Sequence, residues 1–226
     1  MKYTCWGAAK QVTGSMHLLE LDSGYKIMVD CGIDYEDKDN KTINSHFQFN
    51  PKDIDVLLLT HAHIDHSGNI PNLVKQGFKG EIICTEPTAF LLDKLWIDSV
   101  NIQNNNFNRR KTARLYGFKE VKEANEQLLT VNFNQKFTLN SEVSCTFHEA
   151  GHIIGAASIR LEVTEENSIK TIGFTGDLGN SGSKLIVDPE PMQGLNYLIT
   201  ETTYGNRQHK EKRSPEDVLL EYVTKT

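Results

Sequence analysis

Four residues that can bind a metal ion lie within a stretch of six, directly after a short apolar run. His61, His63, Asp65 and His66 follow the run at 56–59. On extended backbone, side chains two positions apart leave on the same side, so the imidazoles of His61 and His63 can reach one ion. Asp65 and His66 belong to the turn that follows and can face a second ion, about 3.5–4 Å away as in other paired sites. Zinc or a neighbouring first-row metal suits these ligands, and the stretch lacks the thiolates that closed structural zinc sites usually contain.

The elements around this stretch place it at the end of a strand. Residues 56–59 are apolar without alternation, which predicts a strand that is buried on both faces in the middle of a sheet. Residues 67–77 carry a proline suited to a first helical turn and a glycine suited to a helix end. The histidines are therefore predicted on a strand-to-helix loop, where the sites of α/β sheets form.

The HxHxDH pattern after an apolar strand resembles the metallo-β-lactamase superfamily, and the other motifs of that family follow in order. Asp30, in the sequence VDCG, resembles the first motif, in which an aspartate supports the metal loop. His152 lies in a stretch, 150–157, that resembles the third motif. Asp177 lies in a stretch, 174–179, that resembles the fourth.

The resemblance implies two zinc ions and six protein ligands: His61, His63, Asp65, His66, His152 and Asp177. The three histidines at 61, 63 and 152 would bind the first ion, Asp65 and His66 would bind the second, and Asp177 would bridge them. Asp65 is also the implied acceptor of the proton of an attacking water. Asp30 and Glu201 complete the implied catalytic set.

Three passages resemble the β-CASP branch of the superfamily, which processes nucleic acids and includes ribonuclease J and the pre-mRNA 3′-end cleavage endonuclease. They are the opening segment 7–15, the segment 155–158 and the segment 201–207. Glu201 matches the acidic motif of this branch, which orients a histidine supplied further along. The resemblance implies a zinc-dependent nuclease that hydrolyses RNA, or DNA, with a water activated by two metal ions.

The same resemblance implies an α/β fold of the metallo-β-lactamase type, with two mixed sheets flanked by helices. Residues 1–205 are expected to form the metallo-β-lactamase-like domain, and 206–226 a linker and the first helix of a truncated β-CASP domain. Family members continue further and contain later histidines that have no counterpart here. The chain is therefore expected to be an amino-terminal fragment whose second metal lacks one ligand and which is itself inactive or weakly active.

Composition limits the kinds of protein that this chain can be. Its 226 residues are 38% hydrophobic and can bury one good core. The net charge of −6 argues against a nonspecific nucleic-acid binder, but it does not exclude a nuclease whose metal ions supply positive charge at the scissile phosphate. The four cysteines lie far apart without a CxxC pair, which predicts buried reduced thiols and no disulfide framework.

The sequence shows neither the apolar core of a signal peptide nor a run of about 18 apolar residues, so a cytoplasmic protein is expected. The expected partner is RNA or another single-stranded nucleic acid. No membrane is expected, and a homodimer is left open.

Apolar periodicity predicts the other elements. Two runs around an Asp/Ser/Gly turn predict a hairpin whose second strand ends at Asp30. The remaining predictions are strands at 81–85, 143–147, 159–163, 172–174 and 195–200, and helices at 87–104, at 118–128 and from 215 onward. The polar stretch 34–53 is predicted as a surface loop near the site, with a role as a lid being the less favoured alternative.

Two further patterns have more than one interpretation. Residues 148–152 satisfy HExxH, the zinc-protease pattern, but a strand pattern precedes it and a glycine lies within it, so a helix is not expected there. His148 is then expected outside the ligand set. A basic segment contains Arg109, Arg110, Lys111 and Arg114 and is a candidate for phosphate contact, although an exposed basic loop is favoured. Residues that bind the substrate are not assigned.

Two other functions remain as alternatives to a nuclease. A hydrolase of small substrates with this fold, such as a lactonase or thioesterase, is disfavoured by the segment 201–205. A non-catalytic scaffold of a processing complex is disfavoured by the intact set of six metal ligands.

Overall fold

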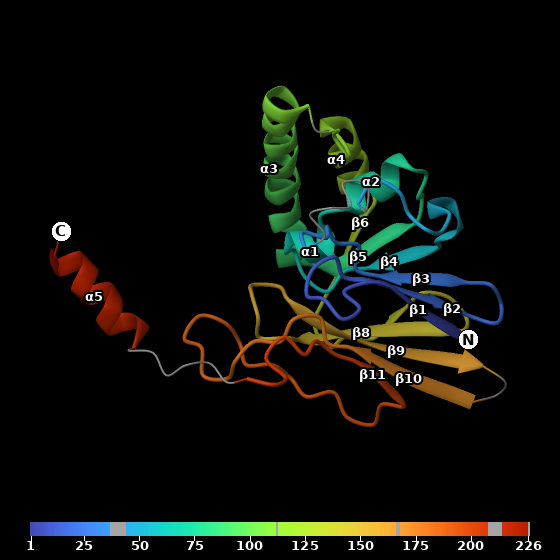
Figure 1. Cartoon of the computed structure of the whole chain (residues 1–226). Coiled ribbons are helices and arrows are strands. Elements are labelled where there is room, and N and C mark those ends of the chain that lie inside the picture. The colour runs from blue at the N-terminus through green and yellow to red at the C-terminus, as the bar shows by residue number, and fades with distance from the viewer. Residues whose placement is uncertain (37–43, 112, 166–167, 208–213, 226) are drawn as a thin grey trace.

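Two mixed β-sheets pack face to face, and helices cover the outer side of the first sheet (Figure 1). In the computed structural model, residues 1–36, 44–111, 113–165, 168–207 and 214–225 are described. The first sheet has the order β1 (Lys2–Gly7), β2 (Met16–Glu20), β3 (Lys26–Val29), β4 (Val56–Leu58), β5 (Glu81–Thr85), β6 (Leu128–Val131). The second has the order β11 (Tyr197–Ile199), β10 (Ser168–Phe174), β9 (Ala157–Glu165), β8 (Val143–Glu149), β7 (Phe137–Thr138).

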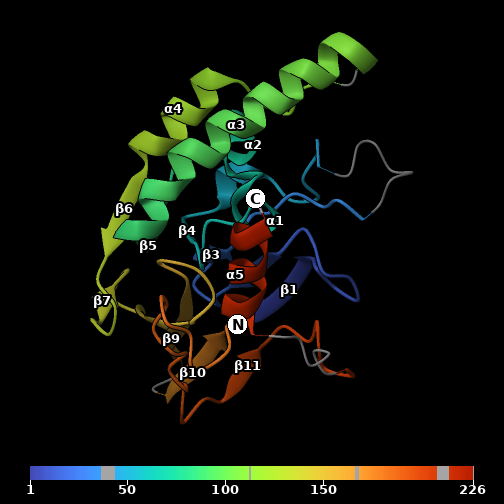
Figure 2. The same cartoon turned by 90° about the vertical axis from the view of Figure 1, so that its left-hand side faces the viewer.

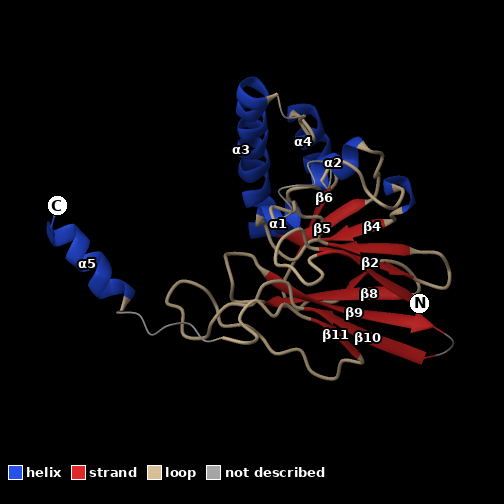
Figure 3. Ribbon diagram, in the orientation of Figure 1, coloured by secondary structure: helices blue, strands red, loops and turns tan. Residues whose placement is uncertain are grey.

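The helices are α1 (Ile64–Ser67), α2 (Ile70–Lys75), α3 (Glu86–Arg110), α4 (Phe118–Glu126) and α5 (Pro215–Lys225), with a short 3-10 turn at Pro51–Asp53. The long helix α3 lies with α4 on the outer side of the first sheet (Figure 2). Figure 3 shows the layers of strand and helix by colour. The predicted α/β class and two mixed sheets are confirmed.

Strand β4 lies at the centre of the packing because both of its faces are buried. Val56 and Leu58 face the second sheet, and Leu57 faces the helices. All three side chains are at most 3% exposed. Burying each of them contributes about 1.5–3 kcal/mol to stability. The prediction of a central strand that ends just before His61 is confirmed.

The second sheet contributes an alternating apolar face. Phe147 on β8 pairs with Ile159 on β9, and both side chains are fully buried between the sheets. On β10, Ile172 is buried whereas Ile169, three positions earlier, is 62% exposed. The period of two that predicted these strands therefore reflects one face against the first sheet and one toward solvent.

Several predicted elements have different bounds in the structure. The helix expected to end near residue 104 continues to Arg110 and ends where Lys111 adopts a left-handed φ of 55°. Residues 104–109 are polar apart from Phe107 and are mostly exposed. Since an exposed helix end needs no apolar stripe, their composition does not stop the helix. Strands β1, β6 and β7 were not predicted. Part of the stretch 34–53, residues 37–43, lies outside the described residues, so a role as a lid is not tested.

All four cysteines are free, and Cys31, Cys84 and Cys145 are buried, as predicted. No helix in the described part of the chain is both long and apolar enough to span a membrane. Helix α5 stands apart from the two sheets (Figure 1), and the expected boundary near residue 205 stays a prediction.

Two isoleucines on β10 give a matched test of the packing between the sheets. Ile172→Ala removes buried methyl groups and leaves a cavity, so it is expected to lower the free energy of unfolding by about 2–5 kcal/mol. Ile169→Ala on the same strand is expected to change it by at most about 0.5 kcal/mol. Urea denaturation of both variants measures the two values, and equal losses would contradict this packing.

Candidate metal centre

The candidate ligands lie at the carboxyl ends of strands from both sheets. His61 and His63 follow β4, and His66 lies in α1 on the same connection. His152 follows β8, and Asp177 follows β10. The two sheets bring these strand ends to one edge of the molecule, so three distant parts of the chain meet there.

Four ligand atoms from His61, His63, His152 and Asp177 converge within 4.8 Å of one another. The Nδ1 atom of His63 lies 3.1 Å from the Nε2 atoms of His61 and His152. The Oδ2 atom of Asp177 lies 3.6 Å from His61 Nε2 and 3.5 Å from His152 Nε2. Tetrahedral ligands held about 2.0–2.1 Å from a zinc ion are about 3.3–3.4 Å apart. The four distances, 3.1 to 3.6 Å, are therefore close to those between ligands of one zinc ion.

The two carboxylate oxygens of Asp177 face different partners. While Oδ2 faces His61 and His152, Oδ1 lies 3.2 Å from His66 Nε2. A carboxylate with one oxygen on each side is the arrangement that a bridge between two ions requires. His66 thus lies on the side of Asp177 where a second ion would bind.

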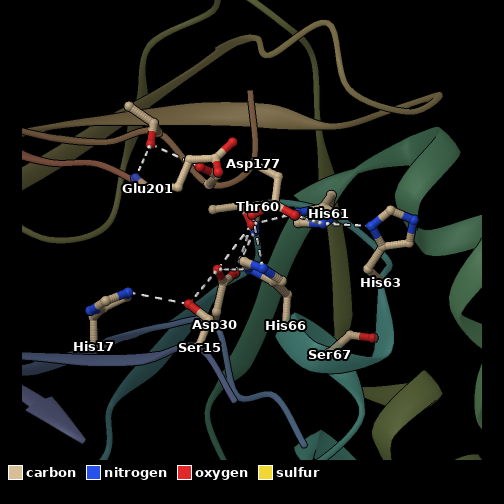
Figure 4. Close-up of polar contacts among 12 residues, drawn as sticks. Ser15, His17, Asp30, Thr60, His61, His63, His66, Ser67, Asp177 and Glu201 are labelled. Carbon is tan, nitrogen blue, oxygen red and sulfur yellow. Dashed lines mark hydrogen bonds and ion pairs between the residues drawn. The ribbon is translucent and has the colours of Figure 1, made fainter. Parts of the chain in front are cut away.

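Asp30 lies beneath this loop and is almost completely buried. Its carboxylate accepts hydrogen bonds from the Thr60 backbone N–H at 2.9 Å and from His66 Nδ1 at 2.7 Å (Figure 4). The hydroxyl groups of Thr60 and Ser15 approach the same carboxylate at 3.0 and 3.3 Å. Asp30 therefore holds the backbone before His61 and the ring of His66 at once.

Asp65 and Glu201 lie near the centre but outside the four-atom group. Asp65 is half-buried in α1, and its charge opposes the lowering of the pKa of His63. Glu201 accepts a hydrogen bond from the Leu178 backbone N–H at 2.9 Å, directly after Asp177. In this structure Glu201 holds the loop of Asp177.

Burial favours the neutral form of His61 and His63, which is the form that metal ligation needs. It lowers the pKa of His61 well below its ordinary value, with the charge of His66 acting in the same direction. It also lowers the pKa of His63, together with the charge of His152. Neutral rings can present their lone pairs to an ion without first losing a proton.

The pair of His66 and Asp177 behaves differently. Burial opposes the charge of His66, but the charge of Asp30 and the hydrogen bond to Asp177 outweigh it and raise the pKa of His66 to about 10. Burial likewise opposes the charge of Asp177, but the hydrogen bond and charge of His66 hold its pKa well below the usual range. In the metal-free protein, charged His66 therefore forms a buried ion pair with Asp30 and a second, partly exposed one with Asp177.

Two structural contributions were missed by the sequence reasoning. The Thr60 hydroxyl lies 3.0 Å from His61 Nδ1, which leaves His61 Nε2 facing the other ligands. The position of Thr60 between a buried strand and the histidine motif was a signal for this role, since a buried hydroxyl needs a hydrogen-bond partner.

The second contribution is Gly179, whose N–H donates to the Ala150 carbonyl at 2.9 Å. A Cβ on Gly179 would lie 1.6 Å from the Gly151 carbonyl oxygen, so the loops of His152 and Asp177 are in direct backbone contact.

The HExxH pattern does not form a zinc-protease site. Residues 148 and 149 belong to strand β8, and His148 Nδ1 lies 2.7 Å from the Asn134 side chain.

The basic segment lies at the end of α3, where Arg114 and Lys111 pack over the ring of Phe107 at 4.6 and 5.7 Å. The side chain of Arg110 lies outside the described residues, and phosphate contact by this segment is not tested.

The buried ion pair gives a pH dependence that can be measured in the metal-free protein. Because the pKa of His66 is raised from 6.5 to about 10, its charge stabilises the fold fully below about pH 6.5, and this stabilisation is lost as the pH rises through about 10. The difference in unfolding free energy between the unmodified protein and His66→Gln, measured by urea denaturation with EDTA, is expected to shrink across this range. His148→Gln is the control. A difference that is constant with pH would contradict the ion pair.

The chain is similar to proteins of established function. Residues 18–175 match the model of the metallo-beta-lactamase superfamily domain. The chain is 32% identical to Ribonuclease TTHA0252 of Thermus thermophilus, over 100% of this chain and 49% of the relative. It is 31% identical to the transcription termination factor FttA of Methanococcus maripaludis, over 89% of this chain and 32% of the relative. It is 29% identical to Endoribonuclease YSH1 of Gibberella zeae, over 99% of this chain and 26% of the relative.

The chain therefore spans about half the length, or less, of the curated relatives that it matches. These relatives confirm the resemblance to the RNA-processing branch. A solved metallo-β-lactamase from Cronobacter sakazakii aligns with 78% of this chain and 57% of its own at 19% identity and a TM-score of 0.48. The fold and its cluster of histidines and aspartate support a metal cofactor. Because the domain match covers most of its length, the chain belongs to the metallo-β-lactamase superfamily.

Proposed function

We propose that this chain carries the metal centre of a zinc-dependent nuclease that hydrolyses phosphodiester bonds of RNA. The observation that carries the proposal is the convergence of four ligand atoms within 4.8 Å of one another, together with the second oxygen of Asp177 that faces His66. The names of the relatives, two of which are ribonucleases, favour RNA over a small substrate.

In this proposal His61, His63, His152 and Asp177 hold the first ion, and Asp65, His66 and Asp177 hold the second. Three imidazoles and a carboxylate, without a thiolate, favour zinc in a catalytic rather than a closed structural site. When bound, zinc lowers the pKa of water to about 7 and neutralises charge on the phosphate oxygens. The positive charge of the ions is needed for binding a phosphate because the chain itself carries a net charge of −6.

The side chains around the ions have separate tasks. Asp30 and Thr60 orient His66 and His61, so that each ring presents Nε2 toward Asp177. Asp65 is only partly buried and lies close enough to His63 to influence the pKa of that ring, which supports a role for Asp65 as acceptor of the proton of the attacking water. Glu201 positions Asp177 through the Leu178 backbone.

A cavity of about 380 Å³ beside the centre offers room for a nucleotide. Asp177, His66 and Glu201 line one part of it, and Lys10 and Gln11 of the opening segment line another. Lys10 is the one Lys or Arg among the described lining residues, and it can meet a phosphate that flanks the scissile one.

Metal binding by the four-atom group can be tested without substrate. In a competition titration with a chelator, His63→Ala and Asp177→Asn are expected to weaken zinc binding by at least about 100-fold, because each removes a ligand. Zinc at about 100 times its dissociation constant is expected to stabilise the unmodified protein by about 2.7 kcal/mol and the variants by much less. His148→Ala serves as the control, since His148 lies outside the group. Unchanged affinity in His63→Ala would refute the site.

The activity is tested on the complete gene product with 5′-labelled single-stranded RNA. Cleavage is expected to stop with EDTA, to return with zinc, and to fall by at least about 100-fold in the His63→Ala and Asp65→Ala double variant. A lactone and a thioester, assayed in parallel, test the small-substrate alternative. RNA cleavage that persists in the double variant would overturn the mechanism, and RNA binding without cleavage would favour a scaffold.

A further inference from the structure

A line of polar side chains connects the metal centre to the edge of the first sheet. From the surface inward, Tyr3 Oη lies 2.8 Å from His17 Nδ1, and His17 Nε2 lies 3.2 Å from Ser15 Oγ. Ser15 Oγ lies 3.3 Å from Asp30 Oδ2, which in turn lies 2.7 Å from His66 Nδ1. Figure 4 shows the inner part of this line, from His17 to His66. Sequence reasoning assigned no role to Tyr3, Ser15 or His17.

The chemistry of the two ends fixes the direction of these hydrogen bonds. The Asp30 carboxylate can only accept, so the single proton of Ser15 points toward it. Ser15 Oγ must then accept from His17 Nε2–H. Burial lowers the pKa of His17, so the ring is neutral and its Nδ1 accepts the proton of Tyr3. The direction of each hydrogen bond in the line thus determines whether the next group donates or accepts.

The Cys5 thiol, the other possible donor to His17 Nδ1, already donates its proton elsewhere. The thiol of Cys5 lies 3.6 Å from His17 Nδ1, but it donates its one proton to the Gly7 carbonyl at 2.8 Å. The ring of Phe174, from the second sheet, packs against His17 with centroids 5.8 Å apart, and Tyr3 stacks beside His17 at 6.0 Å. These contacts hold the plane of the His17 ring, and Tyr3 selects which of its nitrogens carries the proton.

We propose that Tyr3 and His17 are positioning residues for the metal centre, which act through Ser15 to fix the Asp30 carboxylate and thereby the ring of His66. This inference extends the proposed metal centre and rests on it. Without the His17 donor, the Ser15 hydroxyl is free to rotate away from Asp30, which is only 1% exposed and then lacks one of its donors. His66 is held less firmly, and the second ion, which His66 would bind, dissociates more readily. Mutation of residues that hydrogen-bond to metal ligands typically lowers metal affinity by about 10–100-fold.

Three variants separate this role from a merely structural one. His17→Leu removes the donor and is expected to weaken the weaker of two zinc-binding steps by about 10-fold. His17→Gln keeps an N–H donor at the position of Nε2 and is expected to restore that affinity. Tyr3→Phe removes only a hydroxyl from a partly exposed ring, so it preserves the fold and is expected to weaken the same step to a smaller extent. Tyr197→Phe, at an exposed tyrosine on β11, is the matched control.

The experiment combines zinc titration against a competing chelator with ¹⁵N-histidine NMR of the chelated protein. The NMR spectrum is expected to show His17 with its proton on Nε2, and a mixture of tautomers in Tyr3→Phe. A proton on His17 Nδ1 in the unmodified protein, or wild-type zinc affinity in Tyr3→Phe and His17→Leu alike, would overturn the proposal. Neither readout uses RNA, so failure of the nuclease assay would leave this result standing. Loss of zinc binding in the unmodified protein would refute both.

Discussion

One buried carboxylate joins the parts of the chain on which the metal centre depends. Asp30 ends the strand next to β4 and accepts hydrogen bonds from the Thr60 backbone and from the ring of His66. A buried carboxylate without donors would cost several kcal/mol, so the surrounding groups must stay where they are. Asp30 itself has a left-handed φ of 59°, an unfavourable conformation for a residue other than glycine. Such local strain is tolerated where neighbouring contacts over-determine the backbone, as the donors to Asp30 do.

The second constraint is the contact between the two sheets. The Ala157 N–H at the start of β9 donates to the Thr60 carbonyl at 2.8 Å, and this bond links the metal loop of the first sheet to the second. The apolar faces of β8, β9 and β10 pack against β3 and β4. The hydrophobic packing of the two sheets therefore brings His152 and Asp177 to His61, and this packing involves none of the candidate ligands. Preorganisation of this kind keeps the ligand spacing even when each ligand comes from a different connection.

The sequence predicted those features that arise from local patterns. The apolar run before His61 and the alternation around Ile159 and Ile172 identified strands, because burial on one or both faces leaves a direct trace in residue type. The convergence of His61, His152 and Asp177 could not come from spacing, since no local rule determines how two sheets face each other. It was expected only through a family resemblance. Strand β1 was not predicted because it is an edge strand whose residues are exposed or only half-buried. The end of α3 was not predicted because an exposed polar helix and a polar loop have similar compositions.

The hydrogen-bond network around Asp30 could not be predicted from the sequence either. Ser15 ends a segment that resembles the β-CASP branch, but the resemblance gave neither Ser15 nor His17 a role. The line from His17 through Ser15 to Asp30 emerges only from the pairing of β2 with β1 and β3. Thr60 was adjacent to the motif and still went unassigned. Ligands that touch an ion are recognisable by residue type, whereas the groups that orient them are ordinary hydroxyls and backbone amides.

The backbone contact between Gly151 and Gly179 constrains how this protein can diverge. The connections that carry His152 and Asp177 touch without intervening side chains, so an insertion in either one would displace the other, and both would have to change together. Changes of sequence meet fewer constraints at exposed positions such as Leu185, which is 91% exposed. The loops that carry the candidate ligands can thus stay unchanged while exposed positions elsewhere on the surface vary.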